Sequence, residues 1–203
     1  MRKNKRTNPQ RRVKMKKGIA FILSAPAGTG KTTLVQRLTS EKPHIVRNVS
    51  YTTRTPRENE IDGKDYHFIT FQEFERKIKK NEFLEYAEVF GHFYGTCKES
   101  VDKLLNKGCD AILVIDTQGA LVIKRFLKGV YIFMSPPSLE ELEKRLLKRK
   151  TETSFELKTR LDWASHELKQ AVHYNYHIVN SDLDEAYMVL KSIFVAEKFK
   201  VRP

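Results

Sequence analysis

The sequence predicts an α/β fold in which a parallel sheet is covered by helices on both faces. Short apolar runs alternate with longer helical patterns along most of the 203-residue chain. Strands that are joined through helices pair in parallel, because the helix carries the chain back to the edge where the strand began. The first strand, predicted at 19–24, is almost continuously apolar, which is typical of a strand buried on both faces.

The elements after this strand follow in order. A helix is predicted at 31–39, with Leu34, Val35 and Leu38 on one side. Beyond residue 97, strands are predicted at 111–116, 130–134 and 176–179, and helices at 98–106, 118–127, 139–148, 155–172 and 183–198. We therefore expect a single domain over 18–203, with its core formed by 18–44 and 97–203.

Residues 45–96 show a different pattern and predict an inserted subdomain of mixed α+β structure. Asp62-Gly63 and Gly91-His92 are turn signals within it. Short β-prone pieces are found at 49–53, 66–69 and 83–90, and a helix is predicted at 71–80. This subdomain would lie at the edge of the ligand crevice.

Composition limits the class of protein. Hydrophobic residues make up 40% of the chain and charged residues 31%, as in globular proteins. No apolar run approaches the roughly 18 residues of a membrane-spanning helix, so we expect no membrane partner. Cys97 and Cys109 are the only cysteines, which is too few for a disulfide framework and favours the cytoplasm.

The net charge of +13 is concentrated at the N-terminus, where residues 1–17 hold nine Lys and Arg side chains and no acid. Blocks of like charge usually stay solvated, so we interpret this segment as a disordered basic tail. Contact with nucleic acid is one alternative. A leader upstream of a second start at Met15 is another.

Residues 24–33 read SAPAGTGKTT and match the phosphate-binding pattern G-x-x-x-x-G-K-[ST] except at Ala25. Gly28 and Gly30 allow backbone N–H groups to turn toward phosphate oxygens, Lys31 can reach the β- and γ-phosphates, and Thr32 can bind Mg²⁺. Ala25 is tolerable if its φ is negative. The alternative is a glycine-containing turn that binds nothing. The residues expected to contact the triphosphate are Ala25, Pro26, Ala27, Gly28, Thr29, Gly30, Lys31, Thr32 and Thr33.

Further segments follow in a characteristic order: VSYTTRTPRENEIDGKDYHF, EFLEYAEVFGHFYGT, VIDTQGA, FMSPPSLEELEKRLLKR and HIVNSDLDEAY. With the phosphate loop, they make residues 18–198 resemble the guanylate kinases, which transfer a phosphoryl group from ATP to GMP. The resemblance implies a three-layer fold of the P-loop NTPase type, with a GMP-binding subdomain at 45–96 and a helical lid at 138–165. It also implies ATP and GMP as substrates, Mg²⁺ as cofactor, and either a monomer or a homodimer.

Two arginines and two tyrosines form the predicted site for the acceptor phosphate. Arg54 and Arg57 are planar cations three residues apart that can clamp a dianion through bidentate hydrogen bonds. Tyr66 and Tyr94 can add hydroxyl donors. The resemblance implies that all four hold the phosphate of GMP. An exposed basic pair with two core tyrosines is the alternative reading of the residues alone.

Glu85 is predicted to bind the guanine base, which presents two adjacent N–H donors that suit a carboxylate. The resemblance places Ser50, Thr96 and Asp116 beside it, with Thr96 standing where many relatives have serine. The alternative for Glu85 is an exposed carboxylate on a strand.

Residues 144–161, KRLLKRKTETSFELKTRL, place Arg145, Arg149 and Arg160 on two charged helices. The resemblance implies that lid arginines close over ATP, and Arg149 and Arg160 are the preferred pair. A solvated charged face is the alternative. The predicted catalytic set is Lys31, Arg54, Arg149 and Arg160.

Three positions near the nucleotide complete the predictions. The resemblance implies that Asn180, at the end of a predicted strand, contacts adenine. Ser181 and Val114 stand where relatives usually have aspartate. Either the metal relies on Thr32, Asp116 and the phosphates, or Val114 packs in the sheet.

Two other functions remain open from the sequence. A guanylate-kinase-like module that binds a phosphorylated peptide without catalysis would share this fold. A GTPase is disfavoured, because the nearest string to its N-K-x-D guanine motif, residues 106–109, lacks the aspartate.

Overall fold

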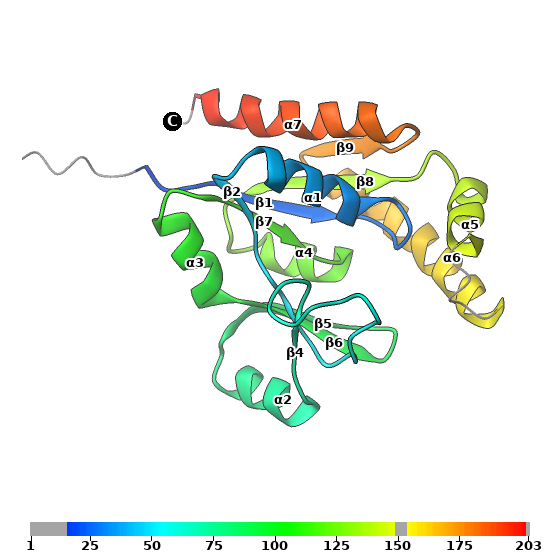
Figure 1. The fold of residues 1–203 in the computed structure, drawn as a ribbon, viewed down its shortest axis with the longest axis horizontal. Helices are drawn as coiled ribbons and strands as arrows, with labels where there is room; N and C mark the ends of the chain where they lie inside the picture. The colour runs from blue at the N-terminus through cyan, green and yellow to red at the C-terminus, as the bar shows by residue number, and fades with distance from the viewer. Residues whose placement is uncertain (1–15, 149–153, 202–203) are drawn as a thin grey trace, which may run out of the picture.

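The computed structural model describes residues 16–148 and 154–201 (Figure 1). Its main sheet has the strand order β2-β7-β1-β8-β9, and every neighbouring pair is parallel. The strands are β1 (Ala20–Ser24), β2 (Ile45–Arg47), β7 (Asp110–Val114), β8 (Val130–Ser135) and β9 (Tyr176–Val179). Since all the strands run the same way, their carboxyl ends share one edge of the sheet.

Helices cover both faces of this sheet, which confirms the three-layer α/β prediction. In Figure 1, α7 and α1 lie above the sheet and α3 and α4 beneath it. The consecutive residues Phe21 and Ile22 of β1 belong to different core clusters, because successive side chains of a strand point to opposite faces. The helices are α1 (Lys31–Glu41), α3 (Lys98–Asn106), α4 (Thr117–Ile123) and α7 (Leu183–Phe199).

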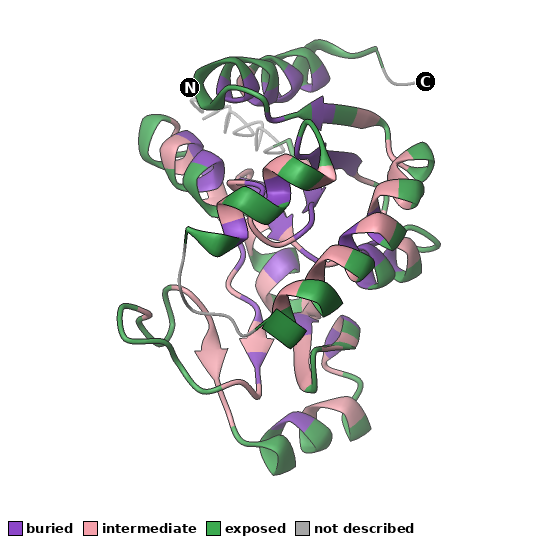
Figure 2. Cartoon of the chain, turned by 90° about the vertical axis from the view of Figure 1, so that its right-hand side faces the viewer, coloured by how far each residue is buried: buried purple, intermediate pink, exposed green. Residues whose placement is uncertain are grey.

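The purple residues in Figure 2 mark this core along the sheet and the inner faces of the helices. On the upper face, Phe21 stacks on Phe194 of α7 with 3.6 Å between ring centroids. Within the described residues, no helix is long and apolar enough to cross a membrane.

A second, mixed sheet forms below the core, with the order β4-β3-β6-β5. Its β3–β4 pair is parallel, while β6 pairs antiparallel with both β3 and β5. Its strands are β3 (Tyr51–Thr52), β4 (His67–Phe68), β5 (Phe83–Val89) and β6 (His92–Cys97).

Helix α2 (Phe71–Lys79) supports this sheet. It begins at a capping box, in which Thr70 accepts from the backbone of Glu73 and the Glu73 carboxylate accepts from the backbone of Thr70. Phe74 of α2 is fully buried and lies 4.6 Å from Phe83 and 5.6 Å from Phe93, centroid to centroid. These rings form the centre of the small subdomain.

The structure differs from the sequence prediction at two strands. β2 was not predicted; it lies within 45–96 but pairs with β7 in the main sheet, so the insertion begins after residue 47. β6 was not predicted either. It contains Gly95, where a Cβ would come 3.0 Å from the rings of Phe74 and Phe83. The close packing of these rings therefore favours glycine, and a glycine weakens the sequence pattern by which a strand is predicted.

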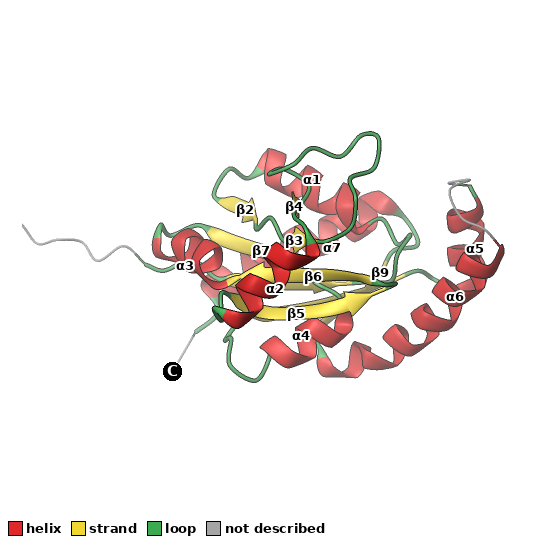
Figure 3. Cartoon of the chain, turned by 90° about the horizontal axis from the view of Figure 1, so that it is seen from below, coloured by secondary structure: helices red, strands yellow, loops and turns green. Residues whose placement is uncertain are grey.

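Helices α5 (Leu139–Leu147) and α6 (Ser154–Lys169) cover most of the range predicted as a lid. They pack through a small cluster of Leu142, Leu146 and Ala164. Figures 1 and 3 place them at one end of the molecule, opposite α3. The helix predicted at 155–172 ends at Lys169 and is followed by a 3-10 turn, η1 (Gln170–His173).

Replacing Phe74 with alanine should destabilise the small subdomain by about 3–5 kcal/mol, because a fully buried ring leaves a cavity. Urea denaturation measures this change in the free energy of unfolding. The matched control is Phe71→Ala in the same helix, since Phe71 is 52% exposed and should cost much less. Equal losses in the two variants would contradict the assignment of Phe74 to the subdomain core.

Candidate active site

The phosphate loop connects the carboxyl end of β1 to the first turn of α1. Gly28 and Gly30 have φ values of 91° and 87°, a left-handed conformation that favours glycine. Among the described residues, the only non-glycine residues with positive φ are Asn81 and Phe90. Ala25 therefore has a backbone conformation that alanine tolerates, as the sequence analysis required.

Lys31 is the first residue of α1, and its side chain turns back over the loop. Its Nζ donates a hydrogen bond to the carbonyl oxygen of Ala25 at 2.8 Å. Burial lowers the pKa of Lys31, while the nearby carboxylates of Glu167 and Asp116 act to raise it. A phosphate oxygen arriving in the cleft would offer this ammonium a charged acceptor in place of the carbonyl.

Asn180 supports the loop from the end of β9. Its side chain is buried, and its Nδ2 donates to the carbonyl oxygen of Thr29 at 2.6 Å. A Cβ at Gly30 would come 2.8 Å from this amide nitrogen. Asn180 thus stabilises the phosphate loop through this hydrogen bond. Its contact with adenine stays a prediction.

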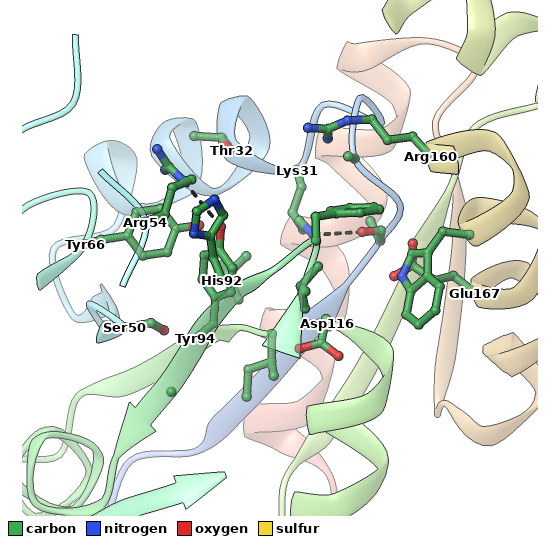
Figure 4. Close-up of a pocket in the computed structure, with 18 of the residues that line it drawn as sticks. Lys31, Thr32, Ser50, Arg54, Tyr66, His92, Tyr94, Asp116, Arg160 and Glu167 are labelled. Carbon is green, nitrogen blue, oxygen red and sulfur yellow. Dashed lines mark hydrogen bonds between the residues drawn. The ribbon is translucent and has the colours of Figure 1, made fainter. Parts of the chain in front are cut away.

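A cleft of about 350 Å³ opens between the phosphate loop, the small sheet, the end of β7 and α6. Figure 4 shows Arg54, Tyr66 and Tyr94 gathered on one side of it and Arg160 and Glu167 on the other. Lys31 lies between the two groups. Of the residues predicted from the sequence, those that line the cleft are Ala25, Ala27, Lys31, Thr32, Ser50, Arg54, Arg57, Tyr66, Glu85, Tyr94, Asp116 and Arg160.

Other predicted site residues do not line this cleft. Arg149 lies outside the described residues. Thr96 is fully buried behind Glu85. The remaining residues without a place in the lining are Pro26, Gly28, Thr29, Gly30, Thr33 and Asn180. Their roles stay predictions.

Arg54 lies on the same side of the cleft as Tyr66 and Tyr94. Its Nε donates to the hydroxyl of Tyr94 at 3.3 Å, and its Nη2 donates to Glu60 at 2.8 Å. The other carboxylate oxygen of Glu60 accepts from the backbone N–H of Arg57. Glu60, which the sequence analysis missed, thus supplies the negative charge that orients Arg54 in this structure.

Glu85 is buried, unlike the exposed Glu88 of the same strand. The hydroxyl of Thr96 donates to its Oε1 at 2.6 Å. Burial raises the pKa of Glu85 to about 7, against the effect of this hydrogen bond and with a contribution from Asp116. Gly119 leaves room for the carboxylate, since a Cβ there would come 2.4 Å from Oε2. The alternative of an exposed strand carboxylate is therefore wrong.

Two residues of the cleft come from β7 and the segment after it: Val114 is the last residue of the strand, and Asp116 follows two residues later. The strand ends at Val114, and Asp116 caps α4, where its Oδ1 accepts from the backbone N–H groups of Gln118 and Gly119. Val114 packs against the core cluster that contains Phe21. Val114 thus packs in the sheet, and it also lines the cleft, so how the metal is held stays a prediction.

One face of α6 contributes residues that the sequence analysis missed. Glu156, Trp163 and Glu167 line the cleft together with Arg160. Their spacing of three and four residues is that of one helix face, and this could have signalled them. Glu167 is 6% exposed, and burial raises its pKa to about 7 with Lys31 opposing the effect. Arg47 and His92 also line the cleft, from strands that were not predicted.

Comparison with known proteins agrees with this arrangement. Residues 17–197 match the family model described as guanylate kinase. The chain is 50% identical to a guanylate kinase of Protochlamydia amoebophila, over 93% of this chain and 95% of that protein. It is 47% identical to a guanylate kinase of Clostridium tetani, over 92% and 90%.

A solved structure resembles the fold as well. The crystal structure of guanylate kinase from Anaplasma phagocytophilum matches with a TM-score of 0.76 and 36% identity, over 92% of this chain and 89% of that one. The family match extends over nearly all of the described residues and includes both sides of the cleft. This chain belongs to the guanylate kinase family.

Proposed function

We propose that this chain transfers the γ-phosphoryl group of ATP to the phosphate of GMP, giving ADP and GDP. The observation that carries the proposal is one cleft whose lining contains Lys31 of the phosphate loop, the buried carboxylate of Glu85 and the guanidinium of Arg54.

The acceptor side suits GMP in both of its parts. The ionised carboxylate of Glu85 can accept from the two adjacent N–H groups of guanine. Arg54, Arg57 and the hydroxyls of Tyr66 and Tyr94 would hold the phosphate. Adenine offers a different pattern of donors, so its binding would leave the buried carboxylate of Glu85 without the two N–H donors of guanine.

The transfer itself requires positioning and positive charge. The attacking oxygen of GMP is already anionic, so no general base is needed. Lys31, Arg54 and Arg160 would stabilise the negative charge that spreads over the phosphoryl oxygens. Arg149, outside the described residues, is proposed as a fourth cation.

The residues of the cleft fit Mg²⁺ bound together with ATP. Among the described residues, no group of three or more His, Cys, Asp and Glu side chains could hold a metal ion alone. Mg²⁺ typically takes one or two protein ligands and completes its shell with phosphate oxygens and water. We propose Thr32 as the protein ligand, and the ion would neutralise charge on the β- and γ-phosphates.

An acceptor panel tests the proposal. We expect GMP to be phosphorylated by ATP in a coupled assay, with AMP, CMP and UMP inactive and dGMP measured alongside them. A Mg²⁺ titration in the same assay should show that turnover requires the ion. The proposal fails if GMP is not phosphorylated at any Mg²⁺ concentration. If no nucleotide of the panel is phosphorylated, a module that binds without catalysis would be favoured.

Lys31→Ala should lower kcat by at least about 100-fold while the affinity for GMP is retained, because the lysine serves the transferring phosphoryl group. Steady-state kinetics and GMP titration by calorimetry measure the two effects. Lys128→Ala, at an exposed lysine, is the control and should behave as the wild type. Near-normal turnover in Lys31→Ala would overturn the mechanism.

Glu85→Gln should raise KM for GMP by about tenfold or more and change KM for ATP little, because a charge-assisted hydrogen bond is lost. The control is Glu88→Gln, an exposed position in the same strand. Losses of equal size for both substrates would rule out a role of Glu85 in reading the base.

The same residue predicts a pH dependence. Guanine needs the ionised carboxylate, and the pKa of Glu85 is about 7, so GMP affinity should fall as the pH drops through 7. Between pH 8 and pH 6.5 the loss is about fourfold. Glu85→Gln, which does not titrate at this position, should remove this contribution and leave only the smaller dependence that comes from the GMP phosphate, whose second pKa is about 6.

A further inference from the structure

The tip of the small sheet contacts helix α6 through an aromatic side chain. Phe90 lies in the turn between β5 and β6. Its ring centroid is 5.0 Å from the guanidinium carbon of Arg160 and 6.4 Å from the ring centroid of Trp163, both on α6. All three residues line the cleft. This is a direct link across the cleft between the acceptor side and the helix that carries Arg160.

The backbone at Phe90 makes this contact costly. Its φ is 51°, a left-handed conformation that is strained for a bulky residue, and Gly91 follows with a φ of 76°. Glycine or asparagine would form the same turn with less strain. Strain of this kind persists where the side chain has a use that outweighs it.

The ring of Phe90 has no role in the core. Phe90 is 44% exposed and belongs to none of the core clusters found in the described residues. Its contacts with α6 are therefore the use that the structure shows. A guanidinium over an aromatic face is held by the ring quadrupole, and the edge of a second ring adds an oriented contact.

We propose that Phe90 is a positioning residue that ties the acceptor side to α6 and orients Arg160 toward the cleft. Figure 4 shows Arg160 extending from α6 toward the side where Lys31 lies. GMP binds the sheet that carries Phe90, and Arg160 serves ATP. The contact therefore couples the two substrates: each one, when bound, favours the arrangement that the other requires. The inference rests on the proposed function.

Kinetics provide the first test. Phe90→Ala keeps a Cβ at the left-handed position, so the strain of the turn is unchanged and only the ring is lost. We expect kcat for GMP phosphorylation to fall about tenfold. KM for GMP at saturating ATP should rise by the factor through which ATP tightens GMP binding to the wild type. The matched control is Phe126→Ala, which removes a ring that is 58% exposed and does not line the cleft. Phe90→Tyr should restore wild-type turnover, because it keeps an aromatic face.

Binding provides the second test. Calorimetric titration with GMP, with and without a non-hydrolysable ATP analogue, measures the coupling between the two substrates. The analogue should tighten GMP binding to the wild type and to Phe90→Tyr, and have little effect on Phe90→Ala. Trp163 is the only tryptophan of the chain, so its fluorescence reports loss of the neighbouring ring in Phe90→Ala.

Each negative outcome has one meaning. The inference is overturned if Phe90→Ala keeps wild-type kcat and coupling, if the wild type shows no coupling, or if Phe126→Ala loses as much activity. In all three cases, phosphorylation of GMP by the wild type would leave the proposed function intact. A wild type that does not phosphorylate GMP would instead refute the function itself.

Discussion

The parallel pairing of β1 with β7 and β8 is the constraint on which the rest of the site depends. It brings the carboxyl ends of these strands to one edge of the sheet. The phosphate loop leaves β1 at this edge, Asp116 follows β7, and Asn180 follows β9 and bonds to the loop. Three segments far apart in the chain thus meet because their strands are paired in one parallel sheet.

The electrostatics of the cleft follow from burial on this edge. Glu85 and Glu167 are both buried, and burial raises the pKa of each to about 7. Burial acts on Lys31 in the opposite sense and lowers its pKa. A buried charge of this kind costs free energy in the protein without ligand. A ligand that supplies a hydrogen-bonding or oppositely charged group stabilises it. The cleft is therefore prepared for a ligand that carries both N–H donors and phosphate.

The small sheet and its loops place Arg54, Tyr94 and Glu85 in the lining of the cleft. Aromatic packing around Phe74 and the close approach that Gly95 allows hold its strands against α2. Glu60 and Tyr94 orient Arg54 on one surface of this sheet. At the tip of this sheet, Phe90 contacts Arg160 of α6, so the small sheet and α6 touch each other.

The sequence by itself determined the strand–loop–helix of the phosphate site and the alternation of strands and helices that makes a parallel sheet. It also determined the family resemblance from which Glu85 and Arg54 were predicted. Each of these is a local pattern, or a short motif in a known order. The tertiary structure alone decided the place of β2, whose partner β7 is distant in the chain and whose three residues are too few to show a period. It also decided that Glu167 is buried near Lys31 and that Glu60 pairs with Arg54. Burial and pairing depend on which distant segments pack together, and no local pattern in the sequence records that.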